Sequence, residues 1–316
     1  MADRNGAEGG DEPLSVQDIK GTYERGGNVM ALFRELEGAD HNSLRAIQTS
    51  YDLQAGSYIR RLERDPAYDD LMERYTASVA RLLDGLGPAS LMEAGVGEAT
   101  ILGKVVTKLA RRPETVLGFD ISWSRVAYGR RHARGRGLRP HLFLGDLSRI
   151  PLEDGSVDVV YTSHSIEPNR GREREMITEL HRVARRWLVL LEPSNELGSE
   201  ETRAHIEKHR YCTDLGRHAR ELGLDVVEHR LFDFCHAAHN QTALLVIRKG
   251  GGDAAPAEGG PRYACPHCRG PLTHAKGNYY CPADLTVFPV VDGVPCLLAG
   301  HGILASKYLE DFGEGP

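Results

Sequence analysis

The residues of this 316-residue chain that are best suited to chemistry begin with an acidic side chain and two glycines in the stretch LMEAGVGEAT. Glu93 ends a short apolar run, and Gly95 and Gly97 allow a tight turn with a close backbone approach to a ligand. The N–H groups of a following helix would point at that ligand. A dinucleotide fingerprint would have a third glycine where this chain has Thr100, which disfavours NAD binding. Two glycines alone also fit a plain strand-to-helix turn.

Two further acidic residues end the next two apolar runs. Asp120 ends TVLGFD, where a carboxylate can accept both hydroxyls of a ribose. Asp146 ends HLFLGD, where it can contact an adenine amino group beside the backbone N–H of Leu147. Each acidic end taken singly could equally cap a helix. Because open α/β sheets bind ligands beyond the carboxyl ends of their strands, three such ends in succession favour a nucleoside site.

A second candidate site lies among the cysteines, of which four of the six fall between positions 265 and 296. Cys265 and Cys268 form a C-x-x-C pair, and Cys281 follows at the spacing of a zinc ribbon. The second pair is incomplete, since CPAD has Asp284 where a fourth cysteine would stand, but a carboxylate can ligate zinc. A knuckle that folds without metal stays open, as do three other fourth ligands: His267, His274 and Cys296.

The elements that must position these residues alternate between strands and helices. Short β-branched runs such as SLMEA, SVDVVYTS and TALLVIRK are separated by amphipathic stretches near 98–111, 122–136, 171–185 and 202–222. This alternation predicts an α/β fold with a largely parallel sheet and helices on both faces. The expected organisation is a disordered tail (1–28), a helical leader (29–86), the α/β domain (87–248), a Gly/Ala/Pro-rich linker (249–261), a small domain (262–300) and a tail (301–316).

Composition narrows the class of protein. The chain is 41% hydrophobic and 27% charged, and it has no apolar run long enough for a membrane span. Its acidic, Gly-rich start MADRNGAEGGDEP does not resemble a secretory signal, so we expect a cytoplasmic protein with no membrane partner. The net charge of −6 makes a nucleic-acid partner unexpected, although RRHARGRGLRP (130–140) is a local basic cluster.

The segment GDLSRIPLEDGSVDVVYTSHSIE (145–167), together with the acidic strand ends, resembles the class I S-adenosylmethionine-dependent methyltransferases over about residues 50–248. The resemblance implies a Rossmann-like doubly wound seven-stranded sheet with an N-terminal helical cap. TSYDLQAGSYIRR also resembles the tyrosine-bearing leader helix of members that act on small molecules. The cofactor contacts implied by the resemblance are Glu93, Gly95, Gly97, Asp120, Ile121, Asp146, Leu147, Ser163, Tyr51 and Tyr58.

Two departures from this family concern the donor loop and the catalytic segment. Ala99 replaces the usual third glycine, and SIEPN stands where many relatives have a Glu-His pair. His164 follows the strand where the resemblance places the transferred methyl, and a neutral imidazole can accept a proton near pH 7. Glu167 would orient it or bind a cationic substrate, and a structural role for His164 stays open. His236, His239 and Asn240 lie in a loop that could face the same pocket.

The C-terminal stretch, above all FPVVDGVPCLL (288–298), resembles the small Trm112-like domain. Free-standing members of that family bind and activate methyltransferases, so a fused copy is expected to do this in cis, with one structural zinc. The reaction expected is methyl transfer to a small metabolite or peptide. The alternatives are an RNA methyltransferase and a non-catalytic cofactor-binding partner protein. The acceptor atom and the oligomeric state are not determined by the sequence.

Overall fold

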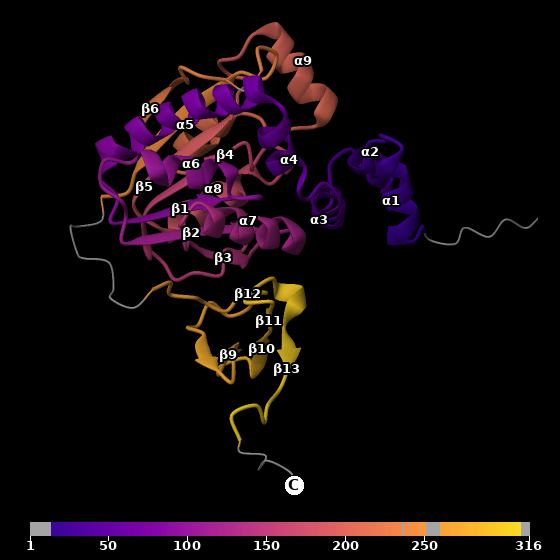
Figure 1. Cartoon of the computed structure of the whole chain (residues 1–316), viewed down its shortest axis with the longest axis vertical. Coiled ribbons are helices and arrows are strands. Elements are labelled where there is room, and N and C mark those ends of the chain that lie inside the picture. Colours follow the sequence, from indigo (N-terminus) through magenta and orange to yellow (C-terminus); the bar gives the residue numbers. More distant parts are fainter. Residues whose placement is uncertain (1–13, 236, 251–259, 311–316) are drawn as a thin grey trace, which may run out of the picture.

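The central element of the computed structural model, which describes residues 14–235, 237–250 and 260–310, is a seven-stranded sheet (Figure 1). The strand order is β3-β2-β1-β4-β5-β7-β6. Its strands are β1 (Ser90–Ala94), β2 (Thr115–Asp120), β3 (His141–Leu144), β4 (Val157–Ser163), β5 (Ala184–Pro193), β6 (Asp225–Leu231) and β7 (Thr242–Arg248). The strands from β3 to β5 run parallel, and β7 is antiparallel to both neighbours. The predicted seven-stranded, largely parallel sheet is confirmed.

Helices cover both faces of this sheet. The helices of the domain are α5 (Pro66–Leu86), α6 (Thr100–Lys108), α7 (Trp123–Gly135), α8 (Glu173–Val183), α9 (Glu200–His209) and α10 (Leu215–Glu221). On one face α5, α6 and α7 form a buried core with strand residues such as Leu91 and Val189. On the other face α8 and α10 pack on residues such as Met92 and Val160. Each fully buried aliphatic side chain contributes about 1.5–3 kcal/mol, so the doubly wound arrangement is stabilised from both sides.

The leader folds into helices that stand beside the sheet (Figure 1). They are α1 (Val16–Glu24), α2 (Val29–Glu37), α3 (Leu44–Leu53) and α4 (Ser57–Arg64). The expectation of disorder over residues 1–28 is wrong for the part that the structure describes, because Ser15 and Asp18 form a capping box at the start of α1. Ile19 of this helix is buried against Val29 and Phe33. Residues 1–13 of the expected tail lie outside the described residues.

The C-terminal region forms a separate small β structure. Its elements are β8 (Thr273–Ala275), β9 (Asn278–Cys281), β10 (Thr286–Phe288), β11 (Val290–Val291), β12 (Val294–Pro295), a 3₁₀ turn η1 (Ala299–His301) and β13 (Ile303–Leu304). The strand β13 pairs with β10, so the small domain continues past the expected boundary at residue 300. Residues 251–259 of the expected linker and 311–316 of the expected tail lie outside the described residues.

The small domain covers the β3 edge of the large sheet, as Figure 1 shows for β12. Cys296 forms a parallel bridge with Leu144, and the Leu297 N–H donates to the Leu144 carbonyl at 3.2 Å. The Tyr263 ring meets the Phe143 ring edge-on, with centroids 5.2 Å apart. This contact gives partners to an otherwise open sheet edge. Over the described residues, no helix has both the length and the apolar character that crossing a membrane requires.

Candidate active site

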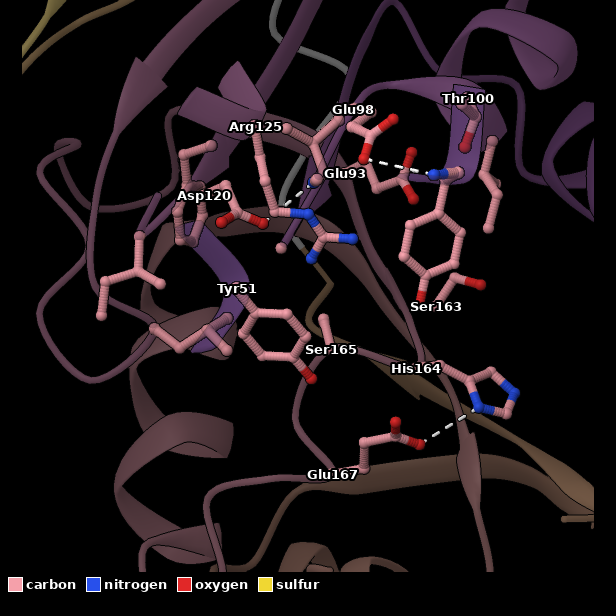
Figure 2. A pocket seen from close by; sticks show the side chains of 18 of the residues that line it. Tyr51, Glu93, Glu98, Thr100, Asp120, Arg125, Ser163, His164, Ser165 and Glu167 are labelled. Atoms are coloured by element: carbon pink, nitrogen blue, oxygen red, sulfur yellow. Dashed lines mark hydrogen bonds and ion pairs between the residues drawn. The ribbon is translucent and has the colours of Figure 1, made fainter. Parts of the chain in front are cut away.

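A cavity of about 260 Å³ lies beyond the carboxyl ends of β1, β2, β3 and β4 (Figure 2). It is lined by every residue that the sequence predicts for the cofactor or for catalysis: Tyr51, Tyr58, Glu93, Gly95, Gly97, Asp120, Ile121, Asp146, Leu147, Ser163, His164 and Glu167. Parallel strands bring their carboxyl ends to one edge, which is why segments distant in sequence meet here. The structure therefore brings the predicted residues together, and their binding roles stay predictions.

The glycine loop between β1 and α6 has left-handed backbone at Gly95 (φ 74°) and Gly97 (φ 51°). A Cβ at Gly95 would lie 2.2 Å from the Ser165 Cβ, so no larger residue fits there without a shift. Ala99 is also left-handed, with φ 54°, and it is the residue before α6. That conformation costs an alanine about 1–2 kcal/mol relative to right-handed backbone. A glycine would be relaxed at this position, which gives a physical reason for the family's third glycine.

Asp120 ties this loop to the end of β2. One carboxylate oxygen accepts the Gly97 N–H at 2.9 Å and the other accepts the Ser122 N–H at 3.0 Å. A carboxylate has about four acceptor positions, so two backbone donors leave capacity for ligand hydroxyls. At the end of β3, Asp146 accepts the Ser148 N–H at 2.9 Å, which fixes the turn that also carries Leu147. Both carboxylates are thus held at the cavity wall by backbone groups.

Glu93 is a buried carboxyl group at the floor of the cavity, with 2% of its surface exposed. Burial raises the pKa of Glu93 to about 8, while the hydrogen bond from Tyr161 acts in the opposite direction. The Tyr161 hydroxyl donates to a Glu93 carboxylate oxygen at 2.8 Å. A second buried pair joins the Tyr75 and Ser163 hydroxyls at 2.7 Å. The floor of the cavity is therefore a hydrogen-bonded layer. A cationic ligand bound next to it would favour the ionised form of the Glu93 carboxyl group.

His164 and Glu167 form a pair at the opposite wall (Figure 2). The imidazole Nδ1 lies 3.2 Å from a Glu167 carboxylate oxygen, and Nε2 lies 2.8 Å from the Thr242 hydroxyl. Burial lowers the pKa of His164, but the hydrogen bond and charge of Glu167 outweigh it and raise the pKa above its ordinary value. His164 also has left-handed backbone, with φ 53°. Both ring nitrogens are engaged, so the imidazole is held rigidly.

Two carboxylates that the sequence analysis missed join the leader to the cavity. Glu98 is buried, and its carboxylate accepts the N–H groups of Gly56 and Ile59, each at 2.9 Å. It thereby caps α4, whose own N-cap residue offers no side chain. In the reverse direction Asp52 of α3 accepts the Ser122 hydroxyl at 2.7 Å, at the start of α7. In the sequence, the one sign that another residue must cap α4 is Gly56, which stands before the helix and has no side chain to cap it.

Arg125 is a third residue that the sequence analysis missed. Its guanidinium carbon lies 4.8 Å from the Tyr51 ring centroid and 5.0 Å from that of Tyr58. Figure 2 shows the guanidinium beside the Asp120 carboxylate and above the Tyr51 ring. Only the fold of the leader over α7 creates this arrangement, and nothing in the local sequence indicates it. The two predicted tyrosines are therefore held at the cavity by a buried cation.

The histidine loop before β7 contributes one cavity residue. Asn240 lines the cavity, whereas His239 does not and instead lies with its ring centroid 4.8 Å from that of His205 on α9. His236 lies outside the described residues. Among the described residues of this loop, it is thus the Asn240 amide that reaches the cavity, and not the His239 imidazole.

The candidate metal centre brings together Cys265, Cys268, Cys281 and Asp284, whose ligand atoms all lie within 4.8 Å of one another. The Cys268 and Cys281 sulfurs are 3.5 Å apart, and the Cys265 sulfur lies 3.0 Å from an Asp284 oxygen. Four ligands of a tetrahedral zinc ion, at about 2.3 Å from the metal for sulfur, lie roughly 3.8 Å apart. The cluster therefore fits zinc both in geometry and in donor type.

The other fourth ligands that the sequence left open lie elsewhere. Cys296 is in the domain seam, where its sulfur contacts the Val294 carbonyl at 3.5 Å. The His267 ring packs toward Phe288, and the His274 ring meets Tyr279. Asp284 is thus the residue that completes the cluster, as the CPAD spacing predicts.

The metal knuckle is joined to the loop that carries Asp146. Arg149 donates from Nε to the Pro266 carbonyl at 2.6 Å and from Nη2 to the His267 carbonyl. The Ala264 N–H donates to the Pro151 carbonyl at 3.1 Å. These contacts run from the first C-x-x-C pair directly to the turn after β3. The knuckle is therefore in direct contact with the segment that follows Asp146 and Leu147.

Comparisons with known proteins found similar proteins for both the α/β domain and the small C-terminal domain. Residues 92–186 match the family described as Methyltransferase domain. The C-terminal part is similar to a UPF0434 protein of Methylibium petroleiphilum, 47% identical over 36 residues that make up 11% of this chain and 55% of that protein. A UPF0434 protein of Azotobacter vinelandii is 51% identical over 37 residues, 11% of this chain and 61% of that protein. The chain spans little more than half the length of these relatives. The prediction of a methyltransferase domain fused to a Trm112-like domain is confirmed.

Among solved structures, the magnesium protoporphyrin IX methyltransferase ChlM of Synechocystis PCC 6803, with bound SAH, is 14% identical with a TM-score of 0.46, over 74% of this chain and 100% of that one. The geranyl diphosphate C-methyltransferase of Streptomyces coelicolor A3(2) is 15% identical with a TM-score of 0.43, over 55% of this chain and 79% of that one. The cyclase SpnF is 21% identical with a TM-score of 0.46, over 57% and 81%. At these sequence identities and TM-scores, the similarity does not indicate which reaction this chain catalyses.

Proposed function

We propose, from the premise that this chain carries an S-adenosylmethionine-dependent methyltransferase domain, that it methylates a small metabolite or a short peptide. The observation that supports this acceptor class is that helices cover the cavity opposite the strand ends. Leu44 and Ile47 of the leader helix α3 and Met72 of α5 line the same space as the strand ends, together with Tyr51 and Tyr58. A site roofed by helices admits a compact acceptor or an extended chain more readily than a large folded surface.

The donor would be held by the residues that line the strand ends. When bound, S-adenosylmethionine supplies a methyl group already activated on a sulfonium, so the protein contributes mainly position, worth roughly 7–11 kcal/mol. Asp120 is assigned to the ribose hydroxyls, and Asp146 with Leu147 and Ile121 to the adenine. The amino-acid end is assigned to the loop and floor: Glu93, Gly95, Gly97 and Ser163, with Tyr51 and Tyr58 closing above.

On the acceptor side, Glu167 is assigned the contact with the substrate and His164 the role of positioning Glu167. Both imidazole nitrogens have partners, Glu167 on Nδ1 and Thr242 on Nε2, which supports a holding role rather than that of a base. Replacing His164 by Gln is expected to preserve cofactor binding by calorimetry and to raise KM for the acceptor. A large loss of kcat with an unchanged KM would instead assign His164 to proton transfer.

The Trm112-like domain is assigned a supporting role for the donor site, through Arg149 and the zinc knuckle. Arg149→Met is expected to weaken cofactor binding several-fold while zinc content by elemental analysis stays at one per chain. Arg262→Met is the matched control, because Arg262 also joins the two parts but through a half-exposed ion pair to Glu153 at 3.5 Å. Equal cofactor affinity in the two variants would contradict the supporting role.

The acceptor is tested with methyl-labelled S-adenosylmethionine and three fractions of a cell extract: filtered metabolites, peptides and RNA. Label is expected in the metabolite or peptide fraction, and mass spectrometry then identifies the product. An Asp120→Ala variant, which lacks the carboxylate assigned to the ribose, is the negative control. Incorporation into RNA alone would overturn the acceptor class but not the methyltransferase assignment.

A second candidate, an RNA acceptor, is favoured by one observation at the domain seam. A cavity of about 230 Å³ is lined by Arg130, Arg134 and Arg139 together with Tyr263 and Tyr279. Across the described residues, none of these arginines has a carboxylate within ion-pair distance. Among these residues Arg130 donates only to a backbone carbonyl, that of Asp292. Arginines without carboxylate partners beside aromatic rings suit a phosphate-bearing chain. Binding of labelled RNA that falls steeply with salt, and that Arg134→Glu abolishes, would support this candidate.

A further inference from the structure

The charges that line the donor cavity are unevenly distributed. Along the part of the chain that the structure describes, the cavity wall includes five acidic side chains: Glu93, Glu98, Asp120, Asp146 and Glu167. The same wall holds one arginine, Arg125, and no lysine. His164 also lines the wall, but its ring nitrogens are engaged by Glu167 and Thr242. A ligand that carries both cationic and anionic groups will be oriented by this pattern, since its anionic group meets one guanidinium and its cationic groups meet several acidic side chains.

Arg125 is buried, yet its hydrogen-bonding capacity is not used within the described chain. The side chain is 8% exposed, and its Nε atom lacks a hydrogen-bond partner. None of the ion pairs within 4.0 Å among the described residues includes Arg125, although Asp120 is close enough to act on it through charge. A guanidinium taken out of water without hydrogen bonds is costly, so this arrangement is suited to a group that arrives from outside.

The surroundings of Arg125 also fix its direction. The rings of Tyr51 and Tyr58 flank it, and its guanidinium carbon would lie 3.3 Å from a Cβ built on Gly97. It is therefore packed between the leader helices and the glycine loop. A planar guanidinium held in this way is prepared for two parallel hydrogen bonds to a carboxylate, a geometry that a lysine cannot reproduce.

We propose that Arg125 binds the carboxylate at the amino-acid end of the donor, an inference that rests on the proposed S-adenosylmethionine site. The donor carries a sulfonium, an ammonium and one carboxylate, and that carboxylate is its anionic group. When the donor carboxylate binds Arg125, the sulfonium and the ammonium can face Glu93 and the other acidic side chains of the wall. The same contact links the donor to the leader, because Tyr51 and Tyr58 pack on the arginine that the carboxylate neutralises.

The test compares three ligands on the full chain by calorimetry: S-adenosylhomocysteine, its decarboxylated analogue, and 5′-methylthioadenosine, which has no amino-acid end. Arg125→Met keeps much of the side-chain length without the charge. It is expected to weaken S-adenosylhomocysteine roughly 10- to 100-fold, as loss of charge-assisted hydrogen bonds does, and to leave the other two ligands within about twofold. Arg125→Lys keeps the charge but not the paired geometry and is expected to show a smaller loss, again for the carboxylate-bearing ligand alone.

The outcomes separate this inference from the proposed function. Equal weakening of all three ligands by Arg125→Met, or no weakening of any, would overturn the carboxylate contact while leaving the donor site intact. Failure of the unaltered protein to bind S-adenosylhomocysteine would overturn the donor site itself. If Arg125→Met does not fold by circular dichroism and thermal unfolding, Arg125→Lys carries the comparison, and an unselective loss in that variant refutes the proposal.

Discussion

Replacing Glu98 by alanine tests how the leader is attached to the donor cavity. The Glu98 side chain is 2% exposed and follows Gly97 in the glycine loop. Its carboxylate accepts the N–H groups of Gly56 and Ile59 at 2.9 Å and that of Tyr58 at 3.4 Å. The helix α4 has no other side-chain cap. The substitution therefore removes the acceptor for these three N–H groups at the start of α4.

The expected magnitude follows from these contacts. A hydrogen bond to a charged group contributes about 1.5–3 kcal/mol, so the two 2.9 Å bonds of Glu98 give an upper range of about 3–6 kcal/mol. Tyr58 and Ile59 are half-buried, and water can satisfy part of the lost bonding. We therefore expect α4 to lose about 2–4 kcal/mol of local stability. At about 1.4 kcal/mol per factor of ten, its opening equilibrium should rise roughly 30- to 700-fold.

Hydrogen exchange followed by mass spectrometry measures this opening directly. Peptides covering α4 (Ser57–Arg64) should exchange faster in Glu98→Ala by that factor, and those covering α8 (Glu173–Val183) should not change. Asn28→Ala is the control, because Asn28 caps a different helix, α2, through one bond to the Ala31 N–H at 3.0 Å and should cost only about 0.5–2 kcal/mol there. Unchanged protection of α4 in Glu98→Ala, with a measurable effect in the control, would refute the reasoning.

Three further predictions concern pH, the glycine turn and the metal. Glu93, whose pKa is raised to about 8 against 4.5 in an exposed carboxyl, holds a proton in the folded state that the unfolded chain releases, so stability should fall between about pH 4.5 and 8. Glu93→Gln should flatten this fall in denaturant titrations at pH 5, 6.5 and 8, and an equally steep fall would count against it. Gly95→Ala should reduce stability and donor affinity far more than Gly137→Ala, since both have positive φ but only the former Cβ meets Ser165, at 2.2 Å; similar thermal midpoints would contradict this. Removing zinc with a chelator, or Cys268→Ser, should lower the midpoint and expose the seam to protease, because a domain this small lacks a sufficient core of its own; metal-free protein with an unchanged midpoint would exclude a structural zinc.

The sequence by itself determined which strand ends meet at the cavity. Glu93, Asp120 and Asp146 each follow an apolar run, and parallel strands must bring such ends to one edge, so local spacing was enough to place them together. The cysteine spacing likewise placed Cys265 and Cys268 on one turn, since a C-x-x-C pair is set by a few consecutive backbone angles. At the incomplete second knuckle, Asp284 occupies the position that the missing cysteine would have, so the sequence placed it with the three cysteines, and its role as a metal ligand stays a prediction.

Only the tertiary structure decided how the leader and the small domain attach. The contacts of Glu98 with Gly56 and of Arg125 with Tyr51 join residues on different elements, and no periodicity indicates which side chains will meet. The same holds for Arg149 and the zinc knuckle, which are separated by more than a hundred positions. Hydrophobic spacing fixes which face of an element is buried, but the docking of one element on another depends on the packing of both faces together. For that reason the sequence predicted the strand-end residues of the cavity but not Glu98 and Arg125, which join the cavity to the leader.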